Sequence, residues 1–366
     1  MKTFRNFVLS MLALLASGCD PAPPEGETEG VDLPLGACGH GLYVLASDYQ
    51  STTLSIVDWD GHVHRRGILS SASTDVGLSA ALSGDVVAPT DELASDELLL
   101  IDRYPAGVVT AFSPSKSEVT QQLTVRTGFA ANPQDALVAR PGVLYVSRYE
   151  ENAQAGSSPH DRGSDVLVLD RAEGAPIGSI DLRPFMAPPL LPRPSRMLSV
   201  SGAVAVLLSA YSRDFTEAGE GRVVLIDPTS DTPFASFGTQ GLVGCSGLAR
   251  SPGGSRLAVG CSGSFGGSSA PTLEDAGIAV FAVDGPGSLR HQRTIAASSL
   301  GGPPSFSLGF LDETTLIAVT FGELDANGST KRDDVAFAID AGTGAATEIL
   351  RSGGQPFSLG DIRCAS

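Results

Sequence analysis

Apolar runs that end at an aspartate recur along this chain at a nearly constant interval. The clearest runs are residues 54–57, 166–169, 223–226, 279–283 and 335–339, and an aspartate directly follows each of them. The last four of these, Asp170, Asp227, Asp284 and Asp340, lie 57, 57 and 56 residues apart. Residues 108–113 supply a further run midway between Asp58 and Asp170. A fixed period of this length indicates a repeat architecture, here with six copies.

Each repeat predicts four short antiparallel strands separated by turns rich in Gly, Pro and small polar residues. The middle strands are apolar at successive positions, which is typical of strands that are covered on both faces. Four strands per repeat of this length predict an all-β fold, a β-propeller with six blades. Residues 75–112 permit two strand assignments, through 86–88 and 98–102, so seven blades are the alternative.

One short motif bears on how the ring closes. Phe306-Ser307-Leu308-Gly309 opens the sixth repeat and recurs as Phe357-Ser358-Leu359-Gly360 near the end of the sequence. The first repeat lacks an opening strand and begins at residue 41. We therefore expect residues 356–364 to pair beside residues 41–46 as a closing C-terminal strand.

The first residues have the pattern of a secretory signal. Lys2 and Arg5 precede an apolar stretch, residues 7–16, that is too short to cross a bilayer. It ends in Ala16-Ser17-Gly18-Cys19, which resembles the lipobox of bacterial lipoproteins. The expected divisions are a signal peptide at 1–18, the lipidated Cys19 with an acidic Pro-rich tether at 19–36, and the propeller at 37–366.

This resemblance implies acylation of Cys19, with chains such as palmitate, and a lipid bilayer as the first partner. The expected location is the cell envelope, on the periplasmic side or at the cell surface, with the inner and outer membranes both left open. Ala16 stands where lipoboxes usually have Leu, so an ordinary secretory signal cleaved nearby is the alternative. Residues 20–36 contain too few apolar side chains to offset the entropy of ordering.

Composition narrows the set of partners. The formal net charge is −17, and no basic run interrupts the acidic surface. Such a charge repels phosphate backbones, so nucleic acid is not expected as a partner. The 43 glycines and 24 prolines suit many short strands joined by tight turns.

Four cysteines remain once Cys19 is assigned to lipid, an even number that suits an oxidising compartment. Cys245 and Cys261 flank a predicted hairpin, and Cys38 and Cys364 lie where the closing strand meets its partner. We expect disulfides between Cys245 and Cys261 and between Cys38 and Cys364. A zinc site is the alternative, although the sequence contains no C-x-x-C motif.

The turn and strand patterns resemble those of the YVTN-type and lactonase-like propellers. Residues 251–259, Ser-Pro-Gly-Gly-Ser-Arg-Leu-Ala-Val, and the recurring Asp-x-x-x-Gly turns carry this resemblance over the whole domain. These motifs are structural, so the resemblance implies blades and leaves the chemistry open.

Ligands of propellers generally gather on the loops that leave the second strand of each blade. An aromatic residue recurs at that position: Tyr49, Tyr104, Tyr149, Tyr211, Phe265 and Phe321. Three arginines, Arg103, Arg148 and Arg213, lie within two residues of a tyrosine. The expected ligand-binding residues are Tyr49, Tyr104, Arg148, Tyr149, Tyr211 and Arg213, with an envelope protein or glycan as the ligand. The alternative is that the aromatics fill gaps between blades.

No catalytic motif and no resident cofactor emerge from the sequence. His62 and His64 share a strand face without an evident third metal ligand, and residues 325–334 only partly match a calcium loop. The first hypothesis is therefore a non-enzymatic binding module. The alternative is a lactonase-like or metal-dependent hydrolase. It requires a divalent metal such as calcium and the convergence of Asp48, Asn132, Asp135, Glu150 and Asp214.

Overall fold

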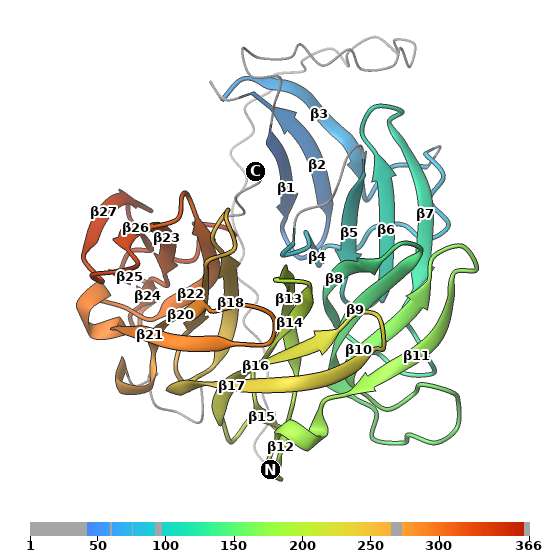
Figure 1. Cartoon of the computed structure of the whole chain (residues 1–366). Coiled ribbons are helices and arrows are strands. Elements are labelled where there is room, and N and C mark those ends of the chain that lie inside the picture. Colours follow the sequence, from blue (N-terminus) through green and yellow to red (C-terminus); the bar gives the residue numbers. More distant parts are fainter. Residues whose placement is uncertain (1–41, 59–60, 75, 92–96, 265–272, 362–366) are drawn as a thin grey trace, which may run out of the picture.

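Six β-sheets are arranged around a common centre in this computed structural model, which describes residues 42–58, 61–74, 76–91, 97–264 and 273–361 (Figure 1). Each sheet consists of antiparallel strands that follow one another along the chain, and we number these sheets blades 1 to 6. The predicted six-bladed propeller is confirmed. Residues 75–112, which permitted a seventh blade, contribute their strands to blade 2 alone.

The first three blades take up the N-terminal half of the described chain. Blade 1 contains β1 (Leu42–Ser47), β2 (Thr52–Val57) and β3 (Val63–Ser70). Blade 2 contains β4 (Val86–Val87), β5 (Leu98–Asp102), β6 (Val108–Ser113) and β7 (Glu118–Thr124). Blade 3 contains β8 (Pro133–Arg140), β9 (Val143–Glu151), β10 (Gly163–Asp170) and β11 (Ala175–Asp181).

The other three blades have four strands each. Blade 4 contains β13 (Pro194–Val200), β14 (Ala203–Leu208), β16 (Glu220–Asp227) and β17 (Thr232–Val243). Blade 5 contains β18 (Cys245–Arg250), β19 (Arg256–Cys261), β20 (Gly277–Val283) and β21 (Leu289–Ala296). Blade 6 contains β22 (Pro304–Phe310), β23 (Thr315–Thr320), β26 (Val335–Asp340) and β27 (Ala346–Arg351).

The remaining elements decorate the loops. Two small sheets pair β12 (Leu190–Leu191) with β15 (Tyr211–Ser212) and β24 (Glu323–Leu324) with β25 (Thr330–Arg332). Helix is limited in the described chain to three 3-10 turns, η1 (Arg183–Phe185), η2 (Leu273–Asp275) and η3 (Ala297–Leu300). Over the same residues, no helix has the length and apolar character needed to cross a bilayer.

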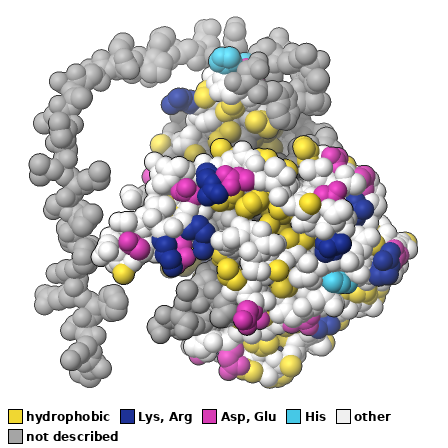
Figure 2. Space-filling view, turned by 90° about the vertical axis from the view of Figure 1, so that its left-hand side faces the viewer, with side chains coloured by type: hydrophobic (Ala, Val, Ile, Leu, Met, Phe, Trp, Pro, Cys, Tyr) yellow, Lys and Arg dark blue, Asp and Glu magenta, His cyan; other side chains and the backbone are white. Residues whose placement is uncertain are grey.

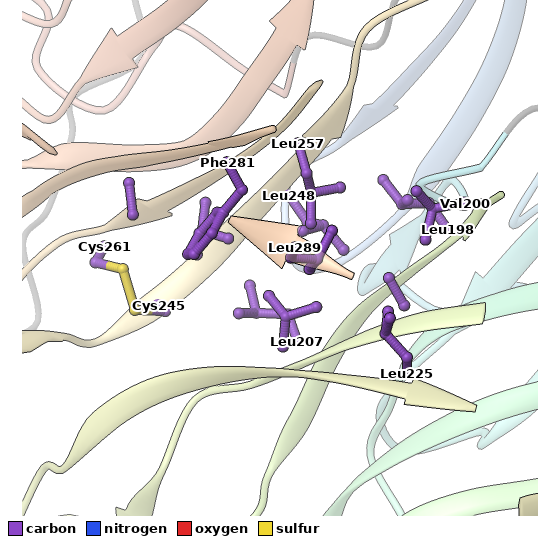
Figure 3. Close-up of a cluster of buried hydrophobic side chains, with 14 of the residues drawn as sticks. Leu198, Val200, Leu207, Leu225, Cys245, Leu248, Leu257, Cys261, Phe281 and Leu289 are labelled. Carbon is purple, nitrogen blue, oxygen red and sulfur yellow. A yellow bond between two sulfur atoms is a disulfide. The ribbon is translucent and has the colours of Figure 1, made fainter. Parts of the chain in front are cut away.

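Burial of both faces explains why the middle strands are apolar at successive positions. All six residues of β14 are buried, as are the first seven of β10, whereas the outer strand β21 alternates buried and accessible positions. Five buried hydrophobic clusters result, and each joins two consecutive blades. The cluster between blades 4 and 5 includes Leu207, Leu225, Leu257 and Phe281 (Figure 3). Within the described chain, no such cluster joins blade 6 to blade 1.

Blade 1 has three strands, as expected from a first repeat that lacks its opening strand. The expected pairing of residues 356–364 with residues 41–46 is not found among the residues that the structure describes. β1 pairs with β2 alone, and residues 356–361 contain no strand. Instead, the Asp334 carboxylate accepts hydrogen bonds from the backbone N–H groups of Phe357 and Leu359, at 2.8 and 2.9 Å. These contacts hold the segment beside blade 6.

The predicted disulfide between Cys245 and Cys261 is present. The two cysteines face each other across β18 and β19, and both are fully buried in the cluster between blades 4 and 5 (Figure 3). The bond therefore links the innermost strand of blade 5 to the next strand. Cys19, Cys38 and Cys364 lie outside the described residues, as does the whole segment 1–36.

Polar side chains link neighbouring blades at the turns. Asp231, in the turn between β16 and β17, accepts hydrogen bonds from Arg140 and from the Tyr145 hydroxyl of blade 3. Burial raises the pKa of Asp231, but these donors outweigh that effect, and its pKa lies below the ordinary aspartate value. The charged carboxylate is therefore favoured by the fold.

Replacement of Asp231 by Asn should lower the free energy of unfolding by about 1.5–3 kcal/mol at neutral pH, because charge-assisted hydrogen bonds to Arg140 and Tyr145 weaken. Asn tolerates the left-handed backbone at this position, where φ is 56°. Since the folded-state pKa is depressed, the contribution is fully present above the ordinary aspartate pKa of 3.8 and is lost as the pH falls through the folded-state value. Urea denaturation at several pH values measures the difference.

The control for this measurement is Asp227→Asn. Asp227 lies in the same turn but bonds only locally, to Thr229 and Ser230. A loss as large as that of Asp231→Asn would contradict a role for Asp231 in joining two blades.

Removal of the internal disulfide by Cys245→Ala/Cys261→Ala should lower the free energy of unfolding by about 2–4 kcal/mol, because the unfolded chain gains freedom and the core loses two sulfur atoms. Denaturation of oxidised wild type and variant measures the difference, and mass spectrometry of peptides identifies the bonded pair. Recovery of both cysteines as free thiols from the unreduced protein would contradict the assignment.

Candidate interaction surface

The loops that connect the second to the third strand of each blade lie at the same face as the starts of the innermost strands, and we call this the loop face. The same backbone hydrogen bond recurs there in five blades. The carbonyl of the residue before the innermost strand accepts an N–H from a residue near the end of the second strand or just after it. These acceptors are Asp85, Asn132, Arg193, Gly244 and Pro303. Three of them, Asn132, Arg193 and Gly244, have positive φ. Of these, Asn132 and Arg193 carry a side chain, so their left-handed backbone is strained.

Arg193 organises an aromatic cluster between blades 3 and 4. Its side chain is fully buried, and its guanidinium lies 3.8 Å from the ring centroid of Phe215 and 5.1 Å from that of Tyr149. The two rings are nearly parallel, with centroids 6.3 Å apart, and Tyr211 packs against Phe215 at 5.7 Å. A planar cation with two aromatic faces is a favourable arrangement because the ring faces carry negative potential.

Hydrogen bonds fix the same guanidinium to both blades. It donates to Glu150 Oε2 at 2.9 Å and to the carbonyl oxygens of Ser212 and Arg213. Burial raises the pKa of Tyr149, although the Arg193 charge opposes this, and burial also raises the pKa of Tyr211. Both phenols are therefore neutral at physiological pH and add no charge beside Arg193.

Arg148 is also fully buried. Its guanidinium donates two hydrogen bonds of 2.7 Å to the Asp165 carboxylate and further ones to the Thr127 hydroxyl and the His160 carbonyl. Arg148 therefore holds the loop after β9 and does not present its charge to solvent. Arg213, in contrast, is largely exposed and pairs with Glu151.

Tyr49 and Tyr104 are the most exposed of the sequence-predicted residues. Their exposed fractions are 84% and 62%. The two loops that carry them both contact residues 83–84: the Ser83 hydroxyl donates to the Tyr104 carbonyl at 3.1 Å, and Gly84 packs against the backbone of Tyr49. A Cβ at Gly84 would lie 2.2 Å from the Tyr49 carbonyl carbon, so only glycine fits there. The structure thus brings two exposed tyrosines onto neighbouring loops of blades 1 and 2.

The six sequence-predicted residues therefore fall into three groups. Tyr149 and Tyr211 meet in the Arg193 cluster, Tyr49 and Tyr104 lie on two loops that both contact residues 83–84, and Arg148 and Arg213 lie in separate ion pairs. Sequence reasoning missed Arg193 and Phe215. Arg193-Pro194 repeats the position of Asn132-Pro133 at the entry to an innermost strand, and that signal could have identified Arg193.

The carboxylates that a hydrolase would require do not converge in the described chain. No group of three or more His, Cys, Asp or Glu side chains suited to a metal ion occurs among those residues. Asp135 is buried and accepts N–H groups of Thr90 and Met197, Glu150 binds Arg193, and Asp48 caps its own turn. Hydrogen bonds from Ser212 and Thr216 lower the pKa of Asp214 to about 2. Each carboxylate therefore has a structural partner.

The aspartates within residues 325–334 likewise accept hydrogen bonds from backbone N–H groups. Asp325 accepts the N–H groups of Asn327 and Ser329, as an Asx turn does. Asp334 accepts those of Gly322, Phe357 and Leu359. Figure 2 shows acidic and basic side chains interspersed with hydrophobic and uncharged ones on the face that it presents.

Comparisons with known proteins support the fold. No protein-family model matches the chain, and no curated protein matches it. Among solved structures, it is similar to the β-propeller domain of Cps50 (Swd1) from Myceliophteria thermophila, with 12% sequence identity, a TM-score of 0.56, and coverage of 86% of this chain and 83% of that one. A chain of the Mitotic Checkpoint Complex aligns with 13% identity and a TM-score of 0.46, over 94% of this chain and 89% of that one. The chain is a β-propeller.

Proposed function

We propose that this chain is a lipid-anchored protein of a bacterial cell envelope whose propeller binds a partner protein through the loop face. The observation that carries the binding function is the pair of exposed tyrosines, Tyr49 and Tyr104, on adjoining loops. Tyrosine supplies a large, partly apolar contact area at little entropic cost, and it is enriched among residues that dominate binding energies.

The adjacent loops give this surface a rigid support. Arg103, one residue from Tyr104, donates to the Asp85 carboxylate at 2.8 Å and to Gln134 Oε1 at 3.1 Å, which ties blade 2 to blade 3. The Asp48 carboxylate accepts N–H groups from Gln50 and Ser51, which lowers its pKa and fixes the turn around Tyr49. Pre-organised loops reduce the ordering cost of association.

The net charge of −17 favours partners whose surface is not acidic. A partner with a neutral or basic surface associates faster with this protein than an acidic one does, because like charges repel during the encounter. The anchoring half of the proposal depends on residues 1–19, with Cys19 as the acylated residue and the envelope as the location.

The double variant Tyr49→Ala/Tyr104→Ala should reduce capture of the partner in the native envelope by at least about tenfold, because truncation of two interface tyrosines removes more than 1.4 kcal/mol of binding free energy. The measurement is crosslinking from a photoreactive residue introduced at Ser51, followed by identification of the attached protein. The protein is otherwise full-length and remains in the bacterial envelope.

The matched control is Phe234→Ala/Ile177→Ala. Both side chains are 51% exposed but lie away from the loop face, on β17 and β11. Equal loss of crosslinking in both double variants, or retention in the tyrosine variant, would contradict the assigned surface. If the crosslinked molecule is a glycan and not a protein, the proposed protein partner is wrong.

Anchoring has a separate test. Replacement of Cys19 by Ala should abolish incorporation of labelled palmitate and move the protein from the membrane fraction to the soluble fraction, because no thiol remains to be acylated. Cys245→Ala/Cys261→Ala is the control, since it removes buried cysteines and should leave labelling intact. Continued labelling of the Cys19→Ala variant would exclude Cys19 as the lipid site.

A further inference from the structure

A cation and a carboxylate that are both largely buried meet the same short segment of chain near the centre of the ring. The cation is Arg196 on β13, the carboxylate is Asp334 before β26, and the segment is residues 356–361, which we call the tail. Arg196 and Asp334 belong to blades 4 and 6, so the tail connects two blades that are not consecutive. Neither residue belongs to blades 1 and 2, which carry the exposed Tyr49 and Tyr104.

Arg196 depends on the tail for its charge partner. Its side chain is only 10% exposed, and its Nε donates to the Ser246 carbonyl at 3.1 Å. Its guanidinium lies 6.0 Å from the ring centroid of Phe306, and one Nη donates to Asp361 Oδ2 at 3.3 Å. Within the described chain, Asp361 is the acidic residue in ion-pair contact with this arginine. A buried guanidinium without an anion is strongly destabilising, so this position requires a carboxylate.

Asp334 binds the backbone of the tail. Its carboxylate accepts the N–H groups of Phe357 and Leu359, two residues apart, and it also accepts the N–H of Gly322. The ring of Phe357 packs against Phe321 at 6.1 Å, and Phe321 packs against Phe306 at 5.8 Å. The site thus offers one acceptor for backbone N–H groups, an aromatic wall and one guanidinium.

Most residues of the tail are exposed to solvent. It forms no strand pairing within the described residues, and Phe357 remains 61% exposed despite its contact with Phe321. Its sequence also matches the innermost strand of blade 6, and blade 1 lacks such a strand. Departure of the tail from its site would leave Arg196 without its carboxylate partner.

We propose that Arg196, Asp334 and the aromatic residues between them form a binding site for an extended peptide that bears a carboxylate, and that the tail occupies this site as a built-in ligand. The peptide that fits has an aromatic residue followed four positions later by an acidic one, as Phe357 and Asp361 are spaced. Its backbone N–H groups bind Asp334, its ring packs on Phe321, and its carboxylate pairs with Arg196. This site is independent of the surface formed by Tyr49 and Tyr104.

The test uses a labelled synthetic peptide with the tail sequence Pro-Phe-Ser-Leu-Gly-Asp, amidated at its C-terminus so that aspartate is its only carboxylate. Fluorescence anisotropy measures its binding to the full-length protein and to the Asp361→Asn variant. The variant should bind the peptide about tenfold more tightly than wild type, because its own tail no longer competes for Arg196. A second peptide that ends in Asn should bind the variant about tenfold more weakly than the first.

Asp312→Asn is the matched control, since it removes an exposed charge from a turn of blade 6 and leaves the tail intact. Its affinity for the peptide should equal that of wild type, as should the affinity of the Tyr49→Ala/Tyr104→Ala variant, which separates this site from the proposed partner surface. Circular dichroism and melting temperature establish that each variant is folded. If folded Asp361→Asn binds neither peptide, or binds both equally, or if Asp312→Asn gains as much affinity, the proposal is wrong.

Discussion

Every blade of this protein must cover the apolar faces of the blades on either side of it. The middle strands have buried side chains on both faces, so a blade alone would expose its hydrophobic surface to water on two sides. Arrangement around a ring solves this problem for blades 2 to 5, because each of these sheets packs between two others. Five of the joints contain continuous hydrophobic clusters, and polar contacts such as that of Asp231 with Arg140 and Tyr145 add to them at the turns.

The fold could be predicted from the sequence because its signal is periodic. Apolar runs ended by an aspartate mark one strand in five of the six repeats, and their continuous apolar character reports burial on two faces. The position of the tail could not be predicted in this way. Residues 357–360 copy the local sequence of an innermost strand, but Asp334 and Arg196 bind this segment from elsewhere in the fold. Contacts between residues so distant along the chain leave no mark in a local pattern.

For the candidate surface, too, the local sequence predicts where a residue lies along its blade but not which distant residues its side chain contacts. Strand order predicted loop positions for all six residues. Tyr49 and Tyr104 are exposed in such loops, whereas Arg148 and Tyr149 lie near the end of β9. Whether a long side chain turns inward or outward depends on partners that strand order does not reveal. Arg148 turns inward because Asp165 and the His160 carbonyl satisfy its donors, whereas Arg213 stays at the surface with Glu151. The buried arginines Arg148 and Arg193 thus hold loops of blades 3 and 4, whereas the exposed tyrosines stand on loops of blades 1 and 2.

The three-stranded blade has a mechanical consequence. Chain that precedes the domain enters it at β1, and among the described residues this strand is attached by hydrogen bonds to β2 alone. A pulling force applied from the N-terminal side would therefore load blade 1 before any other blade, and would peel β1 away one hydrogen bond at a time. The five joints that contain hydrophobic clusters would carry little of this load at first. Blade 1 would therefore unfold first under force, while the other five blades stay folded.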